Sequence, residues 1–123
     1  MENQINHLAQ DSGDRTEFDT GALRDRPSGK GKFVLISPVG LRRLALRCEQ
    51  GHLKYGDGRN WEKGMPISEF IDSALRHLTQ YIDGQNDEDH LAAAMWNIQC
   101  AMHMEEKMPE MQDLPLRRGL MSE

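Results

Sequence analysis

The sequence predicts an all-α protein, a small bundle of three main helices preceded by an extended N-terminal segment. Of its 123 residues, 37% are hydrophobic and only 6% are aromatic. This composition suits a core of leucine, isoleucine, methionine and alanine better than an aromatic-rich β-sandwich. Apolar residues also recur three and four positions apart in three segments, which is the period of an amphipathic helix. Each segment is bounded by residues that begin or end helices.

The first predicted helix has a clear start. Ser37 is a favourable N-cap, and Pro38 follows at the first helical position, where its missing N–H has no consequence. A glycine-rich loop over residues 55–60 ends the helix. The apolar face consists of Leu41, Leu44, Ala45, Cys48 and His52.

The second predicted helix runs from an N-cap at Ser68 to Gly84, a natural C-terminal residue. It carries two apolar stripes, which are Ile71, Leu75, Leu78 and Ile82, and Phe70, Ala74, His77 and Tyr81. An apolar surface this wide needs more than one neighbouring helix. Because three helices provide only a thin core, we expect dimerisation or higher assembly to complete the bundle.

The third predicted helix begins near Asn86 or Asp87, so that the acids of residues 87–89 occupy its first turn. It extends to about Lys107, and Pro109 ends it. The run 34–36 is apolar and is expected to be extended or β-like. The predicted organisation is a flexible arm over 1–20, a helical domain over 21–107 and, over 108–123, either a tail or an arm that docks on a partner chain.

The net charge, the apolar pattern and the cysteine content argue against several classes of protein and site. The net charge of −5 argues against a clamp for DNA or RNA duplexes, which needs a basic footprint. No stretch of 18 apolar residues and no secretory signal pattern occurs, so a cytoplasmic protein is expected. Cys48 and Cys100 lack the spacing of a zinc site, and both are expected to be buried, reduced thiols.

A basic, glycine-containing segment precedes the first helix. It reads GALRDRPSGKGKF and contains Arg24, Arg26, Lys30 and Lys32. Glycines let backbone N–H groups approach an anion, and the cations supply charge for phosphate. The spacing is not that of a Walker A loop. The segment is therefore a candidate phosphate-binding loop or, alternatively, a solvated basic loop.

The loop between the first two helices contains Tyr55, Asn60 and Trp61. An aromatic ring can stack on a nucleobase while an amide bonds its edge. The alternative is that the two aromatic residues close the end of the bundle.

Acidic and histidine residues on the helices offer metal ligands. Glu69 and Asp72 form an E-x-x-D pair, and His90 and Asn97 share a face of the third helix. Converging carboxylates can hold Mg²⁺. In the alternative interpretation, Asp72 forms an ion pair with Arg76, residues 87–89 are ordinary helix-start acids, and His77 is a core residue.

The order of these segments resembles a phage and prophage domain known as dATP/dGTP diphosphohydrolase, N-terminal. The resemblance covers residues 21–103 and rests on GALRD, GKGKF, PVGLRRLAL, KYGDGRNWEKGMP, SALRHL and DEDHLAAAMWN. That domain is similar to the MazG-like all-α nucleotide pyrophosphohydrolases, which bind Mg²⁺ through E-x-x-E and E-x-x-D motifs. Here Glu69 and Asp72 match the second motif, whereas Glu49 stands alone on the first helix. The resemblance implies a pocket lined by Arg76, His77, Asp87, His90 and Asn97.

The resulting hypothesis is a Mg²⁺-dependent enzyme that converts a purine deoxynucleoside triphosphate to the monophosphate and pyrophosphate. The predicted catalytic residues are Glu69, Asp72 and His77, and the predicted metal ligands are Glu49, Glu69, Asp72 and Asp87. The predicted ligand-binding residues are Arg24, Lys30, Lys32, Tyr55, Asn60, Trp61, Arg76, His90 and Asn97. Two alternatives remain open: an inactive phage protein that sequesters a nucleotide signal of host defence in the host cytoplasm, and an adaptor subunit of another enzyme.

Overall fold

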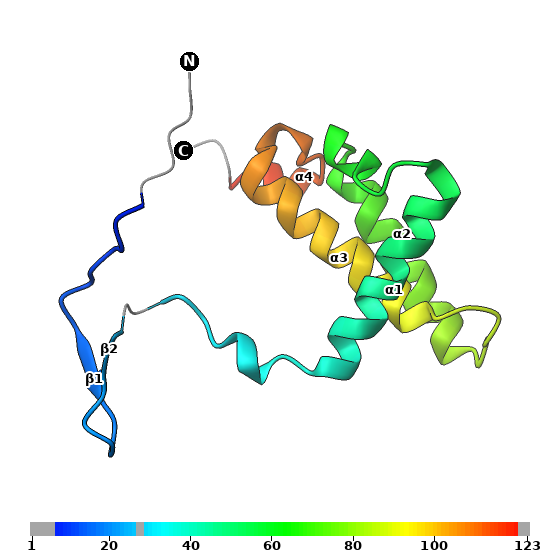
Figure 1. The fold of residues 1–123 in the computed structure, drawn as a ribbon. Coiled ribbons are helices and arrows are strands. Elements are labelled where there is room, and N and C mark those ends of the chain that lie inside the picture. The colour runs from blue at the N-terminus through cyan, green and yellow to red at the C-terminus, as the bar shows by residue number, and fades with distance from the viewer. Residues whose placement is uncertain (1–6, 27–28, 121–123) are drawn as a thin grey trace. The chain divides into compact units, whose positions relative to one another are not determined.

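The computed structural model describes residues 7–26 and 29–120 and confirms the all-α class (Figure 1). The chain divides into two compact units, Met1–Leu35 and Ile36–Glu123. The second unit contains three long helices, α1 (Pro38–Tyr55), α2 (Ile67–Ile82) and α3 (His90–Lys107), and the short helix α4 (Pro115–Arg118).

The first unit contains a small β-hairpin. Strand β1 (Arg15–Glu17) pairs antiparallel with β2 (Leu23–Asp25), with Thr16 opposite Arg24. The hairpin therefore lies across the boundary expected between residues 20 and 21. The prediction that residues 34–36 are extended or β-like is wrong, because Phe33–Leu35 form a 3-10 turn with exposed side chains. Three apolar residues without a neighbouring strand gain no ladder hydrogen bonds from an extended conformation.

Helix α1 begins as predicted. The Ser37 side chain accepts a hydrogen bond from the Gly40 N–H at 3.2 Å, and Pro38 occupies the first helical position. Gly56, in the left-handed conformation, ends the helix. None of the 18 residues of α1 is fully buried, and the expectation of a buried Cys48 is wrong. Cys100 on α3 is buried, and burial raises the pKa of its thiol to about 12.

Helix α2 begins at Ile67, and its N-cap is Pro66, two residues before the expected N-cap Ser68. Because Pro66 has no side-chain acceptor, the orphan N–H groups of the first turn need another partner. Asp113 provides it from the C-terminal segment. Its carboxylate accepts hydrogen bonds from the Ser68 N–H at 2.9 Å and from the Ser68 hydroxyl at 2.5 Å. Gly84 has a positive φ just after the helix, as its position in the sequence indicated.

Helix α3 begins at His90, later than the expected start near Asn86 or Asp87. Asp89 is the N-cap, since its carboxylate accepts a hydrogen bond from the Ala92 N–H at 3.1 Å. The acids at 87 and 88 therefore precede the helix: Asp87 bonds to His90 within the same turn, and Glu88 pairs with Arg47 of α1. The helix ends at Lys107, just before Pro109 as predicted.

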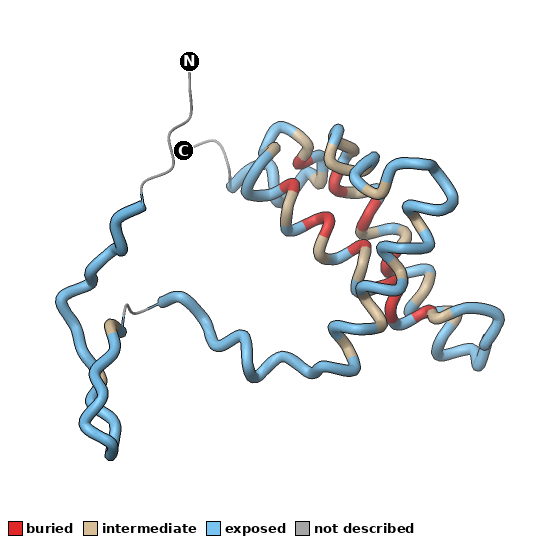
Figure 2. The backbone as a smooth tube through the Cα atoms, viewed as in Figure 1, coloured by how far each residue is buried: buried red, intermediate tan, exposed pale blue. Residues whose placement is uncertain are grey.

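Helices α2 and α3 form an antiparallel pair, which is the main packing contact of the second unit. Ala93, which has no exposed surface, lies in a run of three buried alanines, and small side chains let neighbouring helices approach closely. Buried residues follow α3 and the facing side of α2 (Figure 2). The apolar core lies where α2 begins and α3 ends, and residues 108–114 fold back onto it. Its buried members are Ile67, Phe70, Cys100, Ala101 and Met104, covered by Met108, Met111 and Leu114 among others.

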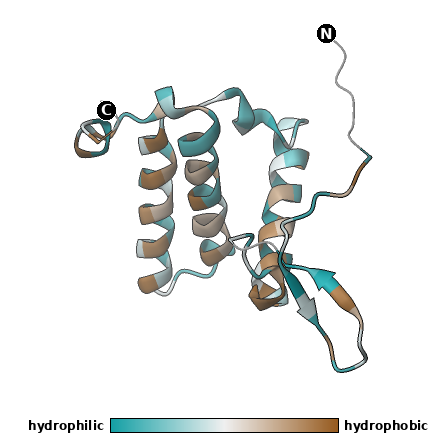
Figure 3. Cartoon of the chain, turned by 90° about the vertical axis from the view of Figure 1, so that its left-hand side faces the viewer, coloured by the Kyte–Doolittle hydropathy of each residue, from teal (hydrophilic) through white to brown (hydrophobic). Residues whose placement is uncertain are grey.

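The two apolar stripes of α2 are covered to different extents, although Ile71 of the first packs on the core and Tyr81 of the second is half exposed. Phe70 and Ala74 are buried, whereas Leu75 and Ile82 of the other stripe are 59% and 83% exposed. Hydrophobic residues recur along the surfaces of the long helices (Figure 3). Among the described residues, no helix combines the length and the apolar character needed to cross a membrane.

Candidate functional site

A pair of histidines joins α2 to α3 at the end of the helix pair away from the apolar core. His77 and His90 face each other with their Nδ1 atoms 3.0 Å apart. His90 is only 2% exposed, and His77 is partly buried. The Nε2 atom of His90 lies 2.8 Å from the Asp87 carboxylate. The antiparallel arrangement of the helices therefore places Asp87, His90 and His77 in one continuous hydrogen-bonded line.

The direction of each hydrogen bond in this line follows from which atoms can donate and which can accept. The bond to His90 holds the pKa of Asp87 below its usual range, so Asp87 is an ionised acceptor. His90 must then donate from Nε2, and in its neutral form it carries a lone pair on Nδ1. That lone pair accepts the hydrogen of His77 Nδ1. The remaining nitrogen of His77, Nε2, is consequently an acceptor.

His77 is held in its neutral form. Burial is the main cause of the lowering of its pKa, and the positive charges of Arg47 and Arg76 and the neighbouring His90 act in the same direction. The negative charge of Glu88 opposes them without reversing the shift. A neutral imidazole with a lone pair is the form that accepts a proton or binds a cation.

Ion pairs connect α1 to the beginning of α3 beside the histidines. Arg43 binds the Asp89 carboxylate through two nitrogens, at 2.6 and 2.8 Å, and this pairing lowers the pKa of Asp89 to about 2. Arg47 donates to Glu88 at 2.7 Å. The side chains of these pairs remain between one quarter and two fifths exposed, so the cations are accessible to an anionic ligand.

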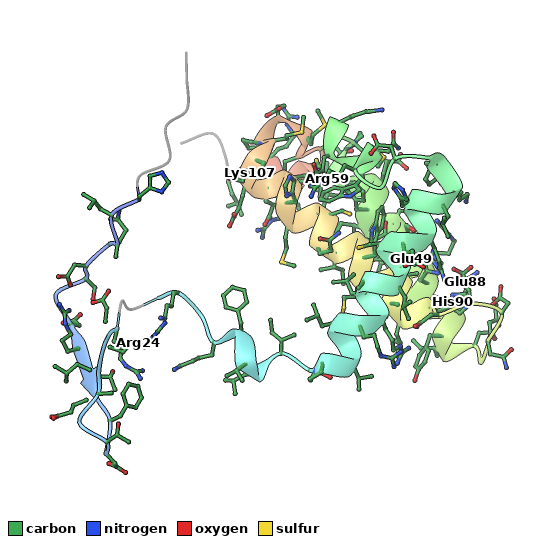
Figure 4. The ribbon with its side chains drawn as sticks, viewed as in Figure 1. Arg24, Glu49, Arg59, Glu88, His90 and Lys107 are labelled. Atoms are coloured by element: carbon green, nitrogen blue, oxygen red, sulfur yellow. The ribbon has the colours of Figure 1, made fainter. Side chains whose placement is uncertain are left out.

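One group of the described residues has the arrangement of metal ligands. It comprises His77, Glu88 and His90, whose ligand atoms all lie within 4.8 Å of one another. Glu88 and His90 project together near the beginning of α3 (Figure 4). Two of the three donors are imidazole nitrogens, whereas Mg²⁺ prefers six oxygen ligands. The chemistry of this group therefore does not fit the Mg²⁺ expected from the sequence.

The four carboxylates predicted to bind Mg²⁺ are not grouped in the described part of the chain. Glu49 is exposed on α1, and Glu69 is exposed in the first turn of α2. Asp72 pairs with Arg76 at 3.0 Å on the exposed face of α2, which is the alternative left open by the sequence. Asp87 binds His90.

The structure thus brings together part of the predicted pocket. His77, His90 and Asp87 are in contact, and Arg76 acts on His77 electrostatically. The amide of Asn97 is buried but donates to the Ala93 carbonyl of its own helix at 2.9 Å. Sequence reasoning did not identify the neighbouring residues Arg43, Arg47, Glu88 and Asp89 as members of the site.

The aromatic candidates lie elsewhere. Trp61 contacts His103 and Trp96 edge-on, with ring centroids 4.8 and 6.3 Å away, and packs on the apolar core. His103 follows His90 by 13 positions on α3, a rise of about 20 Å. Tyr55 is 63% exposed beneath the Lys54 ammonium. The Asn60 side chain accepts a hydrogen bond from Lys63 at 3.3 Å.

The N-terminal unit has a hollow of its own, with a volume of about 340 Å³. Basic side chains from β2 and the following loop surround it, and two glycines with positive φ shape its wall. These features suit an anion. The lining includes Arg24, Arg26, Lys30 and Lys32 together with Thr16, Phe18, Asp25, Gly29 and Gly31.

Comparison with known proteins gives one match. The model of the family described as dATP/dGTP diphosphohydrolase, N-terminal, matches residues 20–114, which include all three long helices. No curated protein and no solved structure matches the chain.

Proposed function

This chain belongs to the dATP/dGTP diphosphohydrolase N-terminal family, and from that membership we propose that it hydrolyses a purine deoxynucleoside triphosphate to the monophosphate and pyrophosphate. The observation that carries the proposal is the line from Asp87 through His90 to His77. It supplies an oriented, neutral imidazole next to the cations of Arg47 and Arg76.

In the proposed reaction, a water oxygen forms a bond to the α-phosphorus. The bond from that phosphorus to the bridging oxygen breaks, and pyrophosphate leaves with the electron pair. His77 Nε2 accepts the proton of the attacking water, as a general base does. Asp87 and His90 hold His77 in the tautomer that can accept it, so they act as positioning residues.

The phosphates would bind the two cations next to His77. Arg47 is paired with Glu88 and Arg76 with Asp72, and all four side chains are at least a quarter exposed. A triphosphate offers guanidinium groups stronger, bidentate acceptors than a solvated carboxylate does. In this proposal Mg²⁺ enters as the counter-ion of the triphosphate.

Product analysis tests this proposal. The full chain is incubated with dATP or dGTP and MgCl₂, and the products are separated by ion-exchange chromatography. We expect the monophosphate and pyrophosphate in equal amounts. His77→Gln should lower kcat about 100-fold or more, as loss of a general base does. His52→Gln, at an exposed histidine of α1, is the matched control and should retain the rate. Absence of turnover, or an unchanged rate in His77→Gln, contradicts the proposal.

A second candidate function is nucleotide binding without hydrolysis. It is favoured by the grouping of His77, Glu88 and His90 without Glu49, Glu69 and Asp72, because the MazG-like hydrolases that the sequence resembles bind Mg²⁺ through carboxylates of this kind. In the same experiment, a nucleotide that binds tightly and is recovered unchanged would support sequestration. A chain that binds no nucleotide would support the adaptor role instead.

We also propose that copies of the chain associate through the uncovered stripe of α2, formed by Leu75, Leu78 and Ile82. These side chains are between 36% and 83% exposed. An apolar helix face of this kind is typically covered by another helix. A second copy would supply that helix in the manner of a larger bundle.

A further inference from the structure

We propose that His77, Glu88 and His90 bind one divalent transition-metal ion with the ligand preferences of Zn²⁺. The inference rests on the site of the proposed function and names the cation for which that site is built. Two of the three ligand atoms in this group are imidazole nitrogens, whereas Mg²⁺ prefers oxygen ligands only. Imidazole suits zinc and its transition-metal neighbours, and three protein ligands leave positions open for water or substrate.

The spacing of the two imidazoles fits a shared ion. Their Nδ1 atoms lie 3.0 Å apart. Two nitrogens that each bind one ion at 2.0–2.1 Å are separated by roughly 3.0 Å at a right-angled geometry and roughly 3.4 Å at a tetrahedral one. A carboxylate oxygen of Glu88 lies within 4.8 Å of both histidines. The three donors can therefore converge on one ion with small side-chain movements.

Asp87 forms the hydrogen bond that a metal-binding histidine typically makes with a carboxylate through its second ring nitrogen. It accepts the hydrogen of His90 Nε2 at 2.8 Å, so the lone pair of His90 is on Nδ1, facing His77. A carboxylate behind a histidine in this way fixes the tautomer and strengthens the ligand. With the two Nδ1 atoms 3.0 Å apart, one of them carries a hydrogen, and a bound metal ion would replace that hydrogen on His77.

The surrounding charges permit a cation. Arg47 donates to one oxygen of Glu88 and leaves the carboxylate a second oxygen with which to bind. Four carboxylates (Asp72, Asp87, Glu88 and Asp89) stand against three guanidinium groups (Arg43, Arg47 and Arg76), so the surrounding side chains carry one net negative charge. With a metal ion bound, activation of water would pass from His77 to the cation.

Cobalt binding tests the inference without any nucleotide. The full chain is stripped of metal with EDTA, dialysed, and titrated with Co²⁺ while visible absorption is recorded; Zn²⁺ and then Mg²⁺ are added as competitors. We expect one equivalent of Co²⁺ to give d–d bands that excess Zn²⁺ abolishes, because Zn²⁺ competes for the same imidazole and carboxylate ligands. Millimolar Mg²⁺ should leave the bands unchanged.

Variants locate the ion. His77→Ala should abolish the bands, and Glu88→Gln should weaken Co²⁺ binding at least tenfold. His52→Ala is the control and should bind as the original chain does, and circular dichroism checks that each variant is folded. The inference is overturned if Co²⁺ gives no d–d bands, if His77→Ala binds normally, or if His52→Ala loses binding equally. Failure of nucleotide hydrolysis alone would leave this result unaffected, so the two proposals are tested separately.

Discussion

Two glycines of the helical unit occupy opposite environments. Gly64 has a φ of +106°, and a Cβ there would lie 2.7 Å from the Met108 methyl group. Gly51 lies within α1, and a Cβ would meet nothing within 4 Å. Gly64→Ala should therefore lower the free energy of unfolding by about 1–3 kcal/mol, the cost of a rare positive-φ conformation in a residue with a Cβ.

Gly51→Ala is the matched control for this prediction. It should raise the free energy of unfolding by up to about 1 kcal/mol, because alanine has the higher helix propensity. Urea denaturation of the two variants and the original chain measures both effects. Equal effects of the two substitutions would show that the loop after α1 does not pack on Met108 as described.

At the scale of single residues, the sequence predicted the central members of the candidate site but not their neighbours. The family motifs pointed to His77, Asp87 and His90, which the structure brings together. Arg43 and Asp89 are 46 positions apart, and their pairing depends on how α1 crosses the beginning of α3. Spacing within one helix carries no information about that crossing, so the ion pairs could not be predicted.

At the scale of elements, helix boundaries were predictable where the signal is local. Ser37 and Pro38 fix the start of α1 by themselves. The start of α2 was misplaced because its first turn is capped by Asp113, a residue 45 positions beyond Ser68. The C-terminal segment is therefore part of the helical unit and stabilises the beginning of α2.

The cap at Asp113 should depend on pH. The hydrogen bonds from Ser68 lower the pKa of the Asp113 carboxyl, so its contribution to stability is present above the unfolded pKa of about 4 and is lost as the pH falls through the folded value. Asp113→Asn should lower the melting temperature at pH 7. The difference from the original chain should shrink towards pH 2.

Glu110→Gln, an exposed acid of the same C-terminal segment, is the control for this comparison and should leave the melting temperature at pH 7 close to that of the original chain. Thermal melts followed by circular dichroism at both pH values provide the measurement. A melting-temperature difference between Asp113→Asn and the original chain that is as large at pH 2 as at pH 7 would argue against the charged cap.

At the scale of the whole molecule, the apolar pattern of α2 exceeds what one copy buries. The sequence predicted two stripes and the need for a cover, and the structure shows that the stripe with Leu75 and Ile82 is open. Ile82→Glu should therefore shift the chain towards the monomer in sedimentation velocity. Leu116→Glu changes an equally exposed residue on α4 and should leave the association unchanged. A monomeric original chain would contradict self-association.

The fold class followed from periodicity because three amphipathic segments have few ways to bury their apolar faces. The β-hairpin was missed because each of its strands has only three residues, and pairing rather than pattern defines them. The placement of Trp61 could not be predicted either, since an aromatic residue in a loop can stack on a base or on a core. Here it contacts Trp96 and His103.

The most direct test of the account is to locate the nucleotide on the chain by NMR. The ¹⁵N-labelled full chain is titrated with a purine deoxynucleoside triphosphate whose α–β bridge is non-hydrolysable. The largest shifts are expected at His77, His90 and the loop 83–89, together with the Arg47 side chain. Shifts confined to the apolar end around Trp61, or the absence of any shift at saturating nucleotide, would contradict a phosphate site at the histidine pair.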